Sequence, residues 1–224
     1  YGATAGRTKY TVTVSGAVQD IFGQTLGEDA TLTFQTGNAD SYLTGPRGPL
    51  TTLDPSSRTP VFTVYTMNYD RLRVRAYAVT PEQWTEYLQY LDNFWRDRGQ
   101  EPPGERVLEQ TIDVQGQPDV LTETAIDLSA ALGGKPGHLI VVVDKPASLL
   151  SLLIPQNDYV VQSWVQVTNI GLDAISDNEQ MAAWATRLSD GAALAGVQLQ
   201  LLPGSTQGTT GADGLARLKL PQSA

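Results

Sequence analysis

The chain has 224 residues, of which 41% are hydrophobic and 17% charged, enough apolar material for one large packed domain or two of ordinary size. Its net charge of -9, without a block of like charges, excludes the clustered basic surface that nucleic acid or an anionic membrane requires, so we predict neither partner. The absence of cysteine excludes disulfides, thiolate metal sites, thiol nucleophiles and a cysteine-derived thioester within these residues, and no apolar run reaches the ~18 residues of a membrane span.

The first unit is predicted to be the end of a sheet. Residues 7–14 and 31–37 alternate polar and apolar side chains, which is typical of half-buried strands, and residues 18–24 are expected to form a turn with a short strand. Because two or three strands are marginal in water, the other strands of this sheet are expected upstream or borrowed. Tyr1 follows neither an initiator methionine nor a signal peptide, so we interpret the sequence as an excised fragment.

The middle of the chain begins with a proline-rich stretch at residues 38–60, predicted to be a linker or an extended lead-in near a domain boundary. Residues 61–67 and 72–79 alternate cleanly and are predicted strands, joined by a hairpin loop at residues 68–71. Arg73 and Arg75 would then lie on an outward, solvated face, and this interpretation is favoured over a binding stripe.

One amphipathic helix is predicted at about 81–98, with Thr80 as N-cap, Pro81 in the first turn and Gly99 after its end. Its apolar face is packed over an open sheet in the favoured interpretation, with a ligand groove as the alternative. That face is made of Trp84, Tyr87, Leu88, Leu91, Phe94 and Trp95.

Further strands are predicted at 107–114, 120–128 and 137–144, the last of them apolar enough to be buried on both faces. Residues 100–104 form a loop, 129–137 a turn, and 145–153 a loop with leucines packed beneath it. We therefore assign residues 38–155 to one β-domain with a single helix.

The final unit, residues 156–224, is predicted to hold about five strands with an acidic turn and two glycine-containing turns, one of them Asp213-Gly214. Its first strand is expected at 163–172. Five strands are fewer than a closed sandwich needs, so we expect this domain to be unfinished. Trp164 and Trp184 are interpreted as core anchors rather than ligand contacts.

No catalytic, cofactor-binding or metal-binding residue is assigned. His138, the one histidine, has no second histidine or cysteine with which to form a dyad or metal cluster, so a hydrogen-bonded structural histidine is favoured over a general base. The best oxygen-ligand cluster lacks the spacing and glycine of a calcium loop, and an acidic turn is favoured. It consists of Asp173, Asp177, Asn178 and Glu179. We predict no cofactor and no enzymatic activity.

Two sets of segments carry a family resemblance. The motifs Tyr-x-Val-x-Val, Val-x-Asp-x-Phe-Gly-Gln-x-Leu and Thr-Leu-Thr-Phe-x-Thr-Gly within residues 10–37 resemble the end of bacterial Ig-like domains, to which we assign residues 1–37. The segments 164–172, 183–191 and 210–216, preceded by Leu72-Arg73-Val74-Arg75-Ala76-Tyr77 and Gly137-His138-Leu139-Ile140-Val141-Val142, resemble macroglobulin domains from the N-terminal half of bacterial α-2-macroglobulins.

This resemblance implies a mainly β fold of tandem antiparallel β-sandwich domains, macroglobulin-like and Ig-like, with one amphipathic helix. It also implies that the full-length protein is a periplasmic or cell-envelope inhibitor, lipid-anchored in many members, that traps target proteases after they cut a bait segment. In many members a thioester then captures the protease, and a penicillin-binding protein is an implied partner. No functional residue is carried over to this chain.

The alternative function is an Ig-like cell-surface adhesin or carbohydrate-binding module, in which exposed aromatic rings such as Trp84 or Trp164 would stack on sugar. An enzyme is a more distant third.

Overall fold

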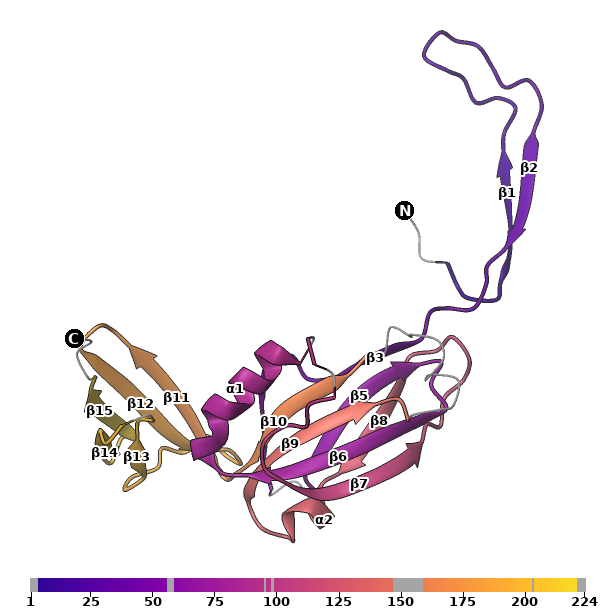
Figure 1. Ribbon diagram of the computed structural model, residues 1–224. Coiled ribbons are helices and arrows are strands. Elements are labelled where there is room, and N and C mark those ends of the chain that lie inside the picture. The colour runs from indigo at the N-terminus through magenta and orange to yellow at the C-terminus, as the bar shows by residue number, and fades with distance from the viewer. Residues whose placement is uncertain are drawn as a thin grey trace.

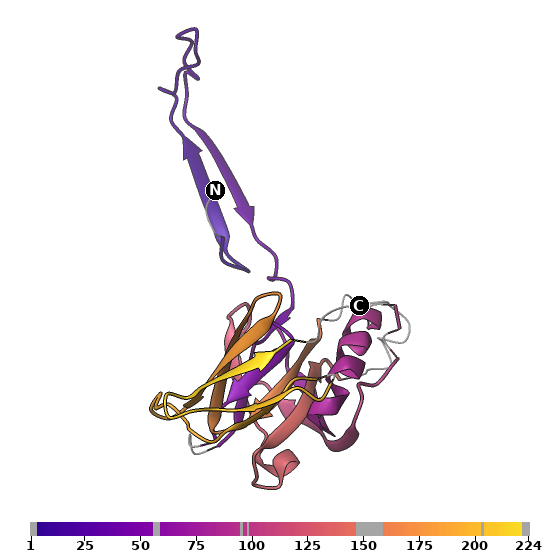
Figure 2. The ribbon, with the colours of Figure 1, turned by 90° about the vertical axis from the view of Figure 1, so that its left-hand side faces the viewer.

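The computed structural model describes residues 4–55, 59–94, 96–97, 99–146, 159–202 and 204–220. The described chain is mainly β, which confirms the predicted fold class, and its parts follow one another as a hairpin, a central sandwich and a small final unit (Figure 1). A view at right angles shows the hairpin standing away from the rest of the molecule (Figure 2).

The hairpin pairs β1 (Lys9–Val14) with β2 (Ala30–Gln35), antiparallel. One of its faces is threonine-rich, with the hydroxyls of Thr11 and Thr33 3.2 Å apart, and the other carries the stacked rings of Tyr10 and Phe34 at 5.5 Å. Every strand residue except Tyr10 is exposed, so this sheet has almost no core of its own.

Two predicted connections differ from the structure. The short strand expected at 18–24 is only a single bridge between Gln19 and Thr25. Of the two interpretations of residues 38–60, a linker or an extended lead-in, the linker is wrong, because the described residues of this stretch supply β3 (Tyr42–Thr44) and β4 (Leu50–Leu53) to the sandwich. Its prolines precede or follow these short strands, where a missing backbone N–H removes no hydrogen bond from the sheet.

The central sandwich consists of a five-stranded sheet in the order β4-β10-β9-β6-β7 and a three-stranded sheet in the order β3-β5-β8. The core between the sheets is built from alternate residues of each strand, which follows from the two-residue period of a strand. The remaining strands of the sandwich are β5 (Val61–Met67), β6 (Arg71–Val79), β7 (Glu105–Asp113), β8 (Thr122–Asp127), β9 (Gly137–Asp144) and β10 (Val161–Val167).

Strand β9 is buried on both faces, as predicted for residues 137–144. Leu139, Val141 and Val143 belong to the core between the two sheets, while Ile140 and Val142 lie under the helix on the other face. A strand with no water-facing side reads as a continuous apolar run, which is why this element was visible in the sequence.

Residues 161–167 form β10, which belongs to the central sandwich and not to the final unit as predicted. The sequence analysis placed these residues in the final unit as the start of one long strand, but β10 pairs antiparallel with β9 and parallel with β4. The predicted strand at 163–172 is two strands, and the second of them is β11 (Ile170–Ser176). The division of the chain at residue 155 stays a prediction, and we propose that it be moved beyond Val167.

Strands β5 and β6 do not form the predicted hairpin, because they lie in different sheets and the loop at 68–70 crosses between them. Arg73 and Arg75 do point away from the main core, but they are not simply solvated. Both bind the buried carboxylate of Asp144, with Arg73 in a two-pronged contact of 2.8 and 2.7 Å and Arg75 at 2.8 Å.

The helix is confirmed but shorter than predicted. A turn of 3-10 helix (Pro81–Gln83) leads into α1 (Trp84–Asn93), and the Thr80 N–H donates to the Gln83 side chain at 3.1 Å. The described residues that follow Asn93, namely Phe94 and residues 96–97, are not helical. Trp95 lies outside the described residues.

The face of α1 packs over the open sheet, as predicted. Tyr87, Tyr90 and Phe94 are buried against Tyr77, Ile140, Val142 and Trp164, whereas Leu88 is exposed. Burial raises the pKa of Tyr87 to about 12 and raises the pKa of Tyr90 as well. A short helix, α2 (Ser129–Leu132), lies within the predicted turn at 129–137.

The final unit combines the sheet β11-β12-β15 with the hairpin β13-β14. The bounds of these strands are β12 (Gln180–Arg187), β13 (Gln198–Gln200), β14 (Gln207–Thr209) and β15 (Leu215–Lys219). Its core is small, formed by Ala183, Ala216 and Leu218. The Asp213-Gly214 turn is confirmed: Gly214 has φ +77, and a Cβ there would meet the Ala185 carbonyl oxygen at 2.6 Å.

Trp164 and Trp184, both predicted to be core anchors, differ in burial. Trp164 is 2% exposed, which confirms it as a core anchor, but Trp184 is 46% exposed, so its assignment to the core is wrong. The alternation along β12 turns Ala183 and Ala185 inward and therefore puts Trp184 on the opposite, uncovered face.

Candidate functional site: the joint between hairpin and sandwich

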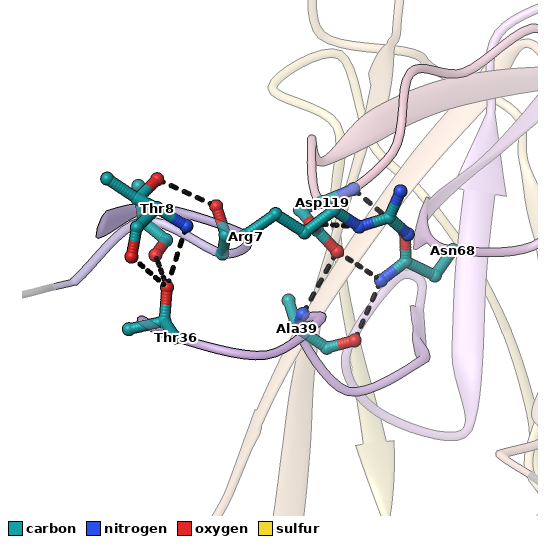
Figure 3. Close-up of polar contacts among 8 residues, drawn as sticks. Arg7, Thr8, Thr36, Ala39, Asn68 and Asp119 are labelled. Atoms are coloured by element: carbon teal, nitrogen blue, oxygen red, sulfur yellow. Dashed lines mark hydrogen bonds and ion pairs between the residues drawn. The ribbon is translucent and has the colours of Figure 1, made fainter. Parts of the chain in front are cut away.

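The candidate site is a polar joint at the base of the hairpin, made by Arg7, Ala39, Asn68 and Asp119 (Figure 3). Arg7 precedes β1 and Ala39 follows β2, whereas Asn68 and Asp119 lie on loops of the sandwich. Four segments distant in sequence therefore meet at one place, where the hairpin leaves the sandwich.

The two ends of the hairpin are first bonded to each other. The Arg7 N–H donates to the Gly37 carbonyl at 2.8 Å, and the Thr8 N–H donates to the Thr36 hydroxyl at 2.9 Å. The Thr36 hydroxyl in turn donates to the Ala5 carbonyl at 2.7 Å. These bonds connect the segment before β1 to the segment after β2, so the two ends of the hairpin contact the sandwich together.

Asp119 is the centre of the joint. Its Oδ1 accepts hydrogen bonds from the Ala39 N–H at 2.9 Å and from Asn68 Nδ2 at 2.8 Å, while its Oδ2 pairs with Arg7 Nε at 3.0 Å. Gly6 packs closely beside it, because a Cβ at Gly6 would meet Asp119 Oδ2 at 2.7 Å. The side chain of Asp119 is 9% exposed, so its charge is largely removed from water and compensated within the joint.

Asn68 also bonds the backbones of Asp119 and Ala39. Its Oδ1 accepts the Asp119 N–H at 2.8 Å, and its Nδ2 also donates to the Ala39 carbonyl at 2.7 Å. Asn68 and Asp119 thus bond each other reciprocally, and both bond the chain that leaves β2. The hydrogen bonds to the carboxylate, first from Asn68 and then from Ala39, hold the pKa of Asp119 below its usual value, with a further contribution from the Arg7 charge.

Backbone strain is concentrated at the joint. Within the described part of the chain, the non-glycine residues with positive φ are Arg7 at +52, Asn68 at +57 and Asp119 at +62, and all three belong to the joint. Asparagine and aspartate tolerate this conformation better than most residues, whereas for arginine it is uncommon. Such residues persist where the surrounding contacts over-determine the backbone.

The joint connects the hairpin to the sandwich through hydrogen bonds and one ion pair. Both oxygens of its carboxylate are engaged, Oδ1 by two hydrogen-bond donors and Oδ2 by Arg7, and a polar cavity of about 370 Å³ is lined by Arg7, Ala39 and Asn68. Across the described ranges, no three His, Asp or Glu side chains are grouped closely enough to hold a metal ion. We therefore expect these contacts to hold the hairpin in one orientation.

The structure gives His138 the hydrogen-bonded structural role that the sequence analysis favoured. Its Nδ1 accepts the indole N–H of Trp164 at 3.1 Å, and its ring lies 5.8 Å from that of Trp164. Burial lowers the pKa of His138, against a smaller opposing effect of the Glu82 charge. Since Nδ1 must stay unprotonated to accept the indole bond, geometry and burial both favour the neutral ring.

Acidification is therefore expected to destabilise the chain through His138. The unfolded histidine binds a proton below pH ~6.5, while the folded one does so only at lower pH, so the free energy of unfolding falls as the pH drops below 6.5. Denaturation at pH 7.5 and 5.5 measures this change. His138→Gln should abolish it, because His138 is the one histidine; a fall of equal size in this variant would contradict the assignment.

The acidic cluster is a turn, as favoured. Asp177 Oδ1 accepts the N–H groups of Glu179 and Gln180, both at 2.8 Å, and these bonds shape the connection between β11 and β12. The same bonds lower the pKa of Asp177. Asp173 lies on β11, opposite Trp184.

The sequence analysis missed the joint. Asn68 lies in the predicted hairpin loop at 68–71, and Asp119 lies between the predicted strands 107–114 and 120–128 without an assignment of its own; each of these residues alone is a common loop residue. The local signal was limited to the turn chemistry of Asn and Asp. Their contact, between residues 51 positions apart, depends on the fold.

No family model matches the sequence, and no curated protein matches it. Among solved structures, native α-2-macroglobulin from Escherichia coli spanning domains MG0-NIE-MG1 aligns with 99% of this chain and 71% of its own chain, at 17% identity and a TM-score of 0.58. A mutant α-2-macroglobulin from Salmonella aligns with 99% of this chain, at 17% identity and a TM-score of 0.58.

This chain spans 13% of that Salmonella chain. Trypsin-activated α-2-macroglobulin from Escherichia coli aligns with 80% of this chain and 12% of its own, at 16% identity and a TM-score of 0.52. At such low identity the likeness concerns the fold, and it extends over almost every residue. The chain shares its fold with bacterial α-2-macroglobulin, over about seven tenths of the segment that spans domains MG0-NIE-MG1.

Proposed function

We propose that this chain is a structural part of the N-terminal region of a bacterial α-2-macroglobulin-like protease inhibitor that traps proteases in the cell envelope. The observation that carries the proposal is the fold likeness over 99% of the chain to the Escherichia coli protein. A trypsin-activated form of that protein also shares the fold, which supports a protease as the partner of the full-length molecule.

In this proposal the chain is a scaffold and not an enzyme. The joint supports that role, because an almost coreless hairpin is held by a dense polar network at one fixed place. The exposed apolar face of the hairpin, which includes Val12, Leu32 and Phe34, would be covered by the remaining strands of its own domain. A periplasmic location, a lipid anchor and a penicillin-binding protein partner belong to the same proposal and rest on the family resemblance alone.

No helix in the described ranges is long and apolar enough to cross a bilayer.

The test compares the full-length protein that contains this segment with the 224-residue chain alone. Each is mixed with trypsin, and hydrolysis of a large protein substrate and of a small chromogenic peptide is followed. A trap should suppress cleavage of the large substrate and spare that of the small one, because the enclosed protease keeps its active site. We expect this result from the full-length protein and no inhibition from the chain alone.

Two outcomes would reject the proposal. If the full-length protein leaves cleavage of the large substrate unchanged, it is not a trap. If the chain alone inhibits trypsin at stoichiometric concentration, it is not merely a scaffold.

The alternative function, a carbohydrate-binding adhesin, receives less support from the geometry. Trp164 is buried beneath α1 with its indole N–H bonded to His138, so its ring is not free to stack on a sugar. We expect a glycan array to show no binding, and a reproducible sugar ligand would favour the adhesin.

A further inference from the structure

A second surface of the sandwich, separate from the joint, combines an apolar pocket with an open strand edge. The pocket has a volume of about 340 Å³. It lies at the N-terminal end of α1, beside sheet residues such as Trp164 and His138. Its apolar wall includes Leu50, Trp84, Trp164 and Leu202, and its polar wall includes His138 and Gln166. Leu202 comes from the final unit, so two parts of the chain contribute to the pocket.

Strand β4 forms one edge of this sheet, and among the described strands its one partner is β10. The Trp164 N–H donates to the Pro49 carbonyl at 2.8 Å, and the Thr168 N–H donates to the Leu53 carbonyl at 3.1 Å. Backbone groups alternate in direction along a strand, so those of Pro49, Thr51 and Leu53 face β10. The N–H and C=O groups of Leu50 and Thr52 therefore face away from the sheet.

The side chains of these two residues lie on the same side as the pocket. Leu50 is opposite Trp164 and Thr52 is opposite Gln166, and both Trp164 and Gln166 line the pocket. Leu50 and Thr52 are also exposed. A strand added beside β4 would thus meet two outward N–H groups and two outward C=O groups, and its side chains on one face would reach the pocket.

The two edges of the five-stranded sheet differ in their protection. The opposite edge, β7, carries the charged residues Glu105, Arg106, Glu109 and Asp113, which discourage pairing with another chain. Strand β4 has the sequence Leu-Thr-Thr-Leu and no charge. An uncharged, exposed edge beside an apolar pocket is the combination used when an extended peptide adds to a sheet.

The polar and charged groups around the pocket define the partner further. Because His138 Nδ1 accepts the indole bond, the neutral ring carries its proton on Nε2 and offers a donor. The Glu82 charge acts on His138, and the described residues that line the pocket include no lysine or arginine. The site therefore favours a segment with a hydrogen-bond acceptor and a positive charge over an acidic one.

We propose that the β4 edge and this pocket bind an extended segment of a partner protein, which adds a strand to β4, places one apolar side chain in the pocket and carries a basic residue near Glu82. This inference goes beyond the proposed scaffold role and does not depend on it.

The probe is a capped hexapeptide, Lys-Thr-Leu-Thr-Leu-Lys, added to the 15N-labelled chain and followed by NMR and amide hydrogen exchange. We expect binding that slows exchange of the Leu50 and Thr52 amides. The same peptide N-methylated at its leucines, which removes backbone donors, should bind more weakly, as should a peptide with glutamate in place of lysine.

Protein variants separate the edge from the pocket. Thr52→Pro removes an outward N–H and should weaken binding about tenfold, as expected for one lost hydrogen bond with a steric clash. Thr52→Val keeps that N–H and should bind like the unaltered chain. Leu202→Ser should weaken binding, because it removes apolar surface from the pocket wall. Leu188→Ser is the same substitution at an exposed leucine outside the pocket, and it should leave binding unchanged.

Unchanged amide signals from Val141 and Val143 show that each variant is folded. The proposal is overturned if neither amide of β4 is protected, if Thr52→Pro and Thr52→Val bind equally, or if none of the peptides binds at millimolar concentration. It is also overturned if the same amides become protected without peptide as the chain dimerises, because the occupant is then a second copy.

Discussion

Replacing Asp144 with alanine is expected to lower the free energy of unfolding of the sandwich by about 3 kcal/mol, within the range measured when one partner of a buried ion pair is removed. Asp144 is 7% exposed and accepts bonds from both Arg73 and Arg75. Without the carboxylate, the largely buried guanidinium of Arg75 keeps its desolvation cost and loses its anion. Arg73, which is more exposed, can turn towards water, so the low end of the range is appropriate.

A surface pair provides the matched control. Arg106 and Glu109 are 3.0 Å apart on the sandwich strand β7, but their side chains are 44% and 45% exposed, so Glu109→Ala should leave the free energy of unfolding almost unchanged. Urea denaturation followed through the amide signals of β9 measures the sandwich itself, even if other parts of the chain unfold separately. Equal losses in the two variants would contradict this account of Asp144.

A third variant isolates the cause. If the unpaired charge is responsible, replacing Arg73 and Arg75 with methionine in the Asp144→Leu background should recover most of the lost stability, since apolar replacement of a buried ion network is often neutral or stabilising. If the three-residue change is instead as unstable as Asp144→Ala, the loss comes from packing.

At the joint, Asp119→Ala is expected to release the hairpin from its fixed orientation. The substitution removes the acceptor of the Ala39 N–H, the acceptor of the Asn68 amide and the partner of Arg7. It also removes part of the contacts that hold the three backbone conformations with positive φ, at Arg7, Asn68 and position 119. Among the described elements, the strands of the hairpin pack on each other and not on those of the sandwich, so no large apolar interface replaces these bonds, and relative motion of the parts is then the default.

The absence of cysteine makes the measurement direct. Spin labels on Thr13→Cys in β1 and Ala125→Cys in β8 report the distance between hairpin and sandwich. We expect one narrow distribution for the unaltered chain and a distribution about twofold broader or more in Asp119→Ala, as for a joint that lacks a holding interface.

Asp20→Ala is the matched control, because Asp20 also accepts two backbone N–H groups but does so at the far loop of the hairpin. Its distribution should stay narrow. Asp119→Asn keeps one acceptor oxygen and loses the ion pair, so an intermediate width is expected. A narrow distribution in Asp119→Ala would show that the orientation is set elsewhere.

Strand positions in this chain were readable from the sequence because alternation is a local property. Strands β1, β5, β6 and β9 lie close to where the pattern placed them. The phase of the alternation separates the two faces of a strand but does not say which face is covered. For this reason Trp164 and Trp184, similar in sequence context, were both assigned to the core, while one of them is exposed.

Sheet membership could not be read in the same way. Strand β10 precedes β11 with a two-residue interruption, so nothing local separates it from the final unit, yet its hydrogen bonds go to β9 and β4. The ion pairs of Arg73 and Arg75 could not be predicted either, because their partner Asp144 is 71 and 69 positions away in the sequence. Interactions between distant positions decided the features that the sequence analysis missed.

The parallel pairing of β4 with β10 also has a consequence for synthesis. Thr51 and Ser163, whose hydroxyls are 2.8 Å apart, are separated by 112 positions in the sequence. At about 5–20 residues per second, β4 leaves the ribosome on the order of ten seconds before its neighbour. During that interval its uncharged Leu-Thr-Thr-Leu edge is unpaired on both sides, which exposes the nascent chain to mispairing at this strand rather than at the charged β7.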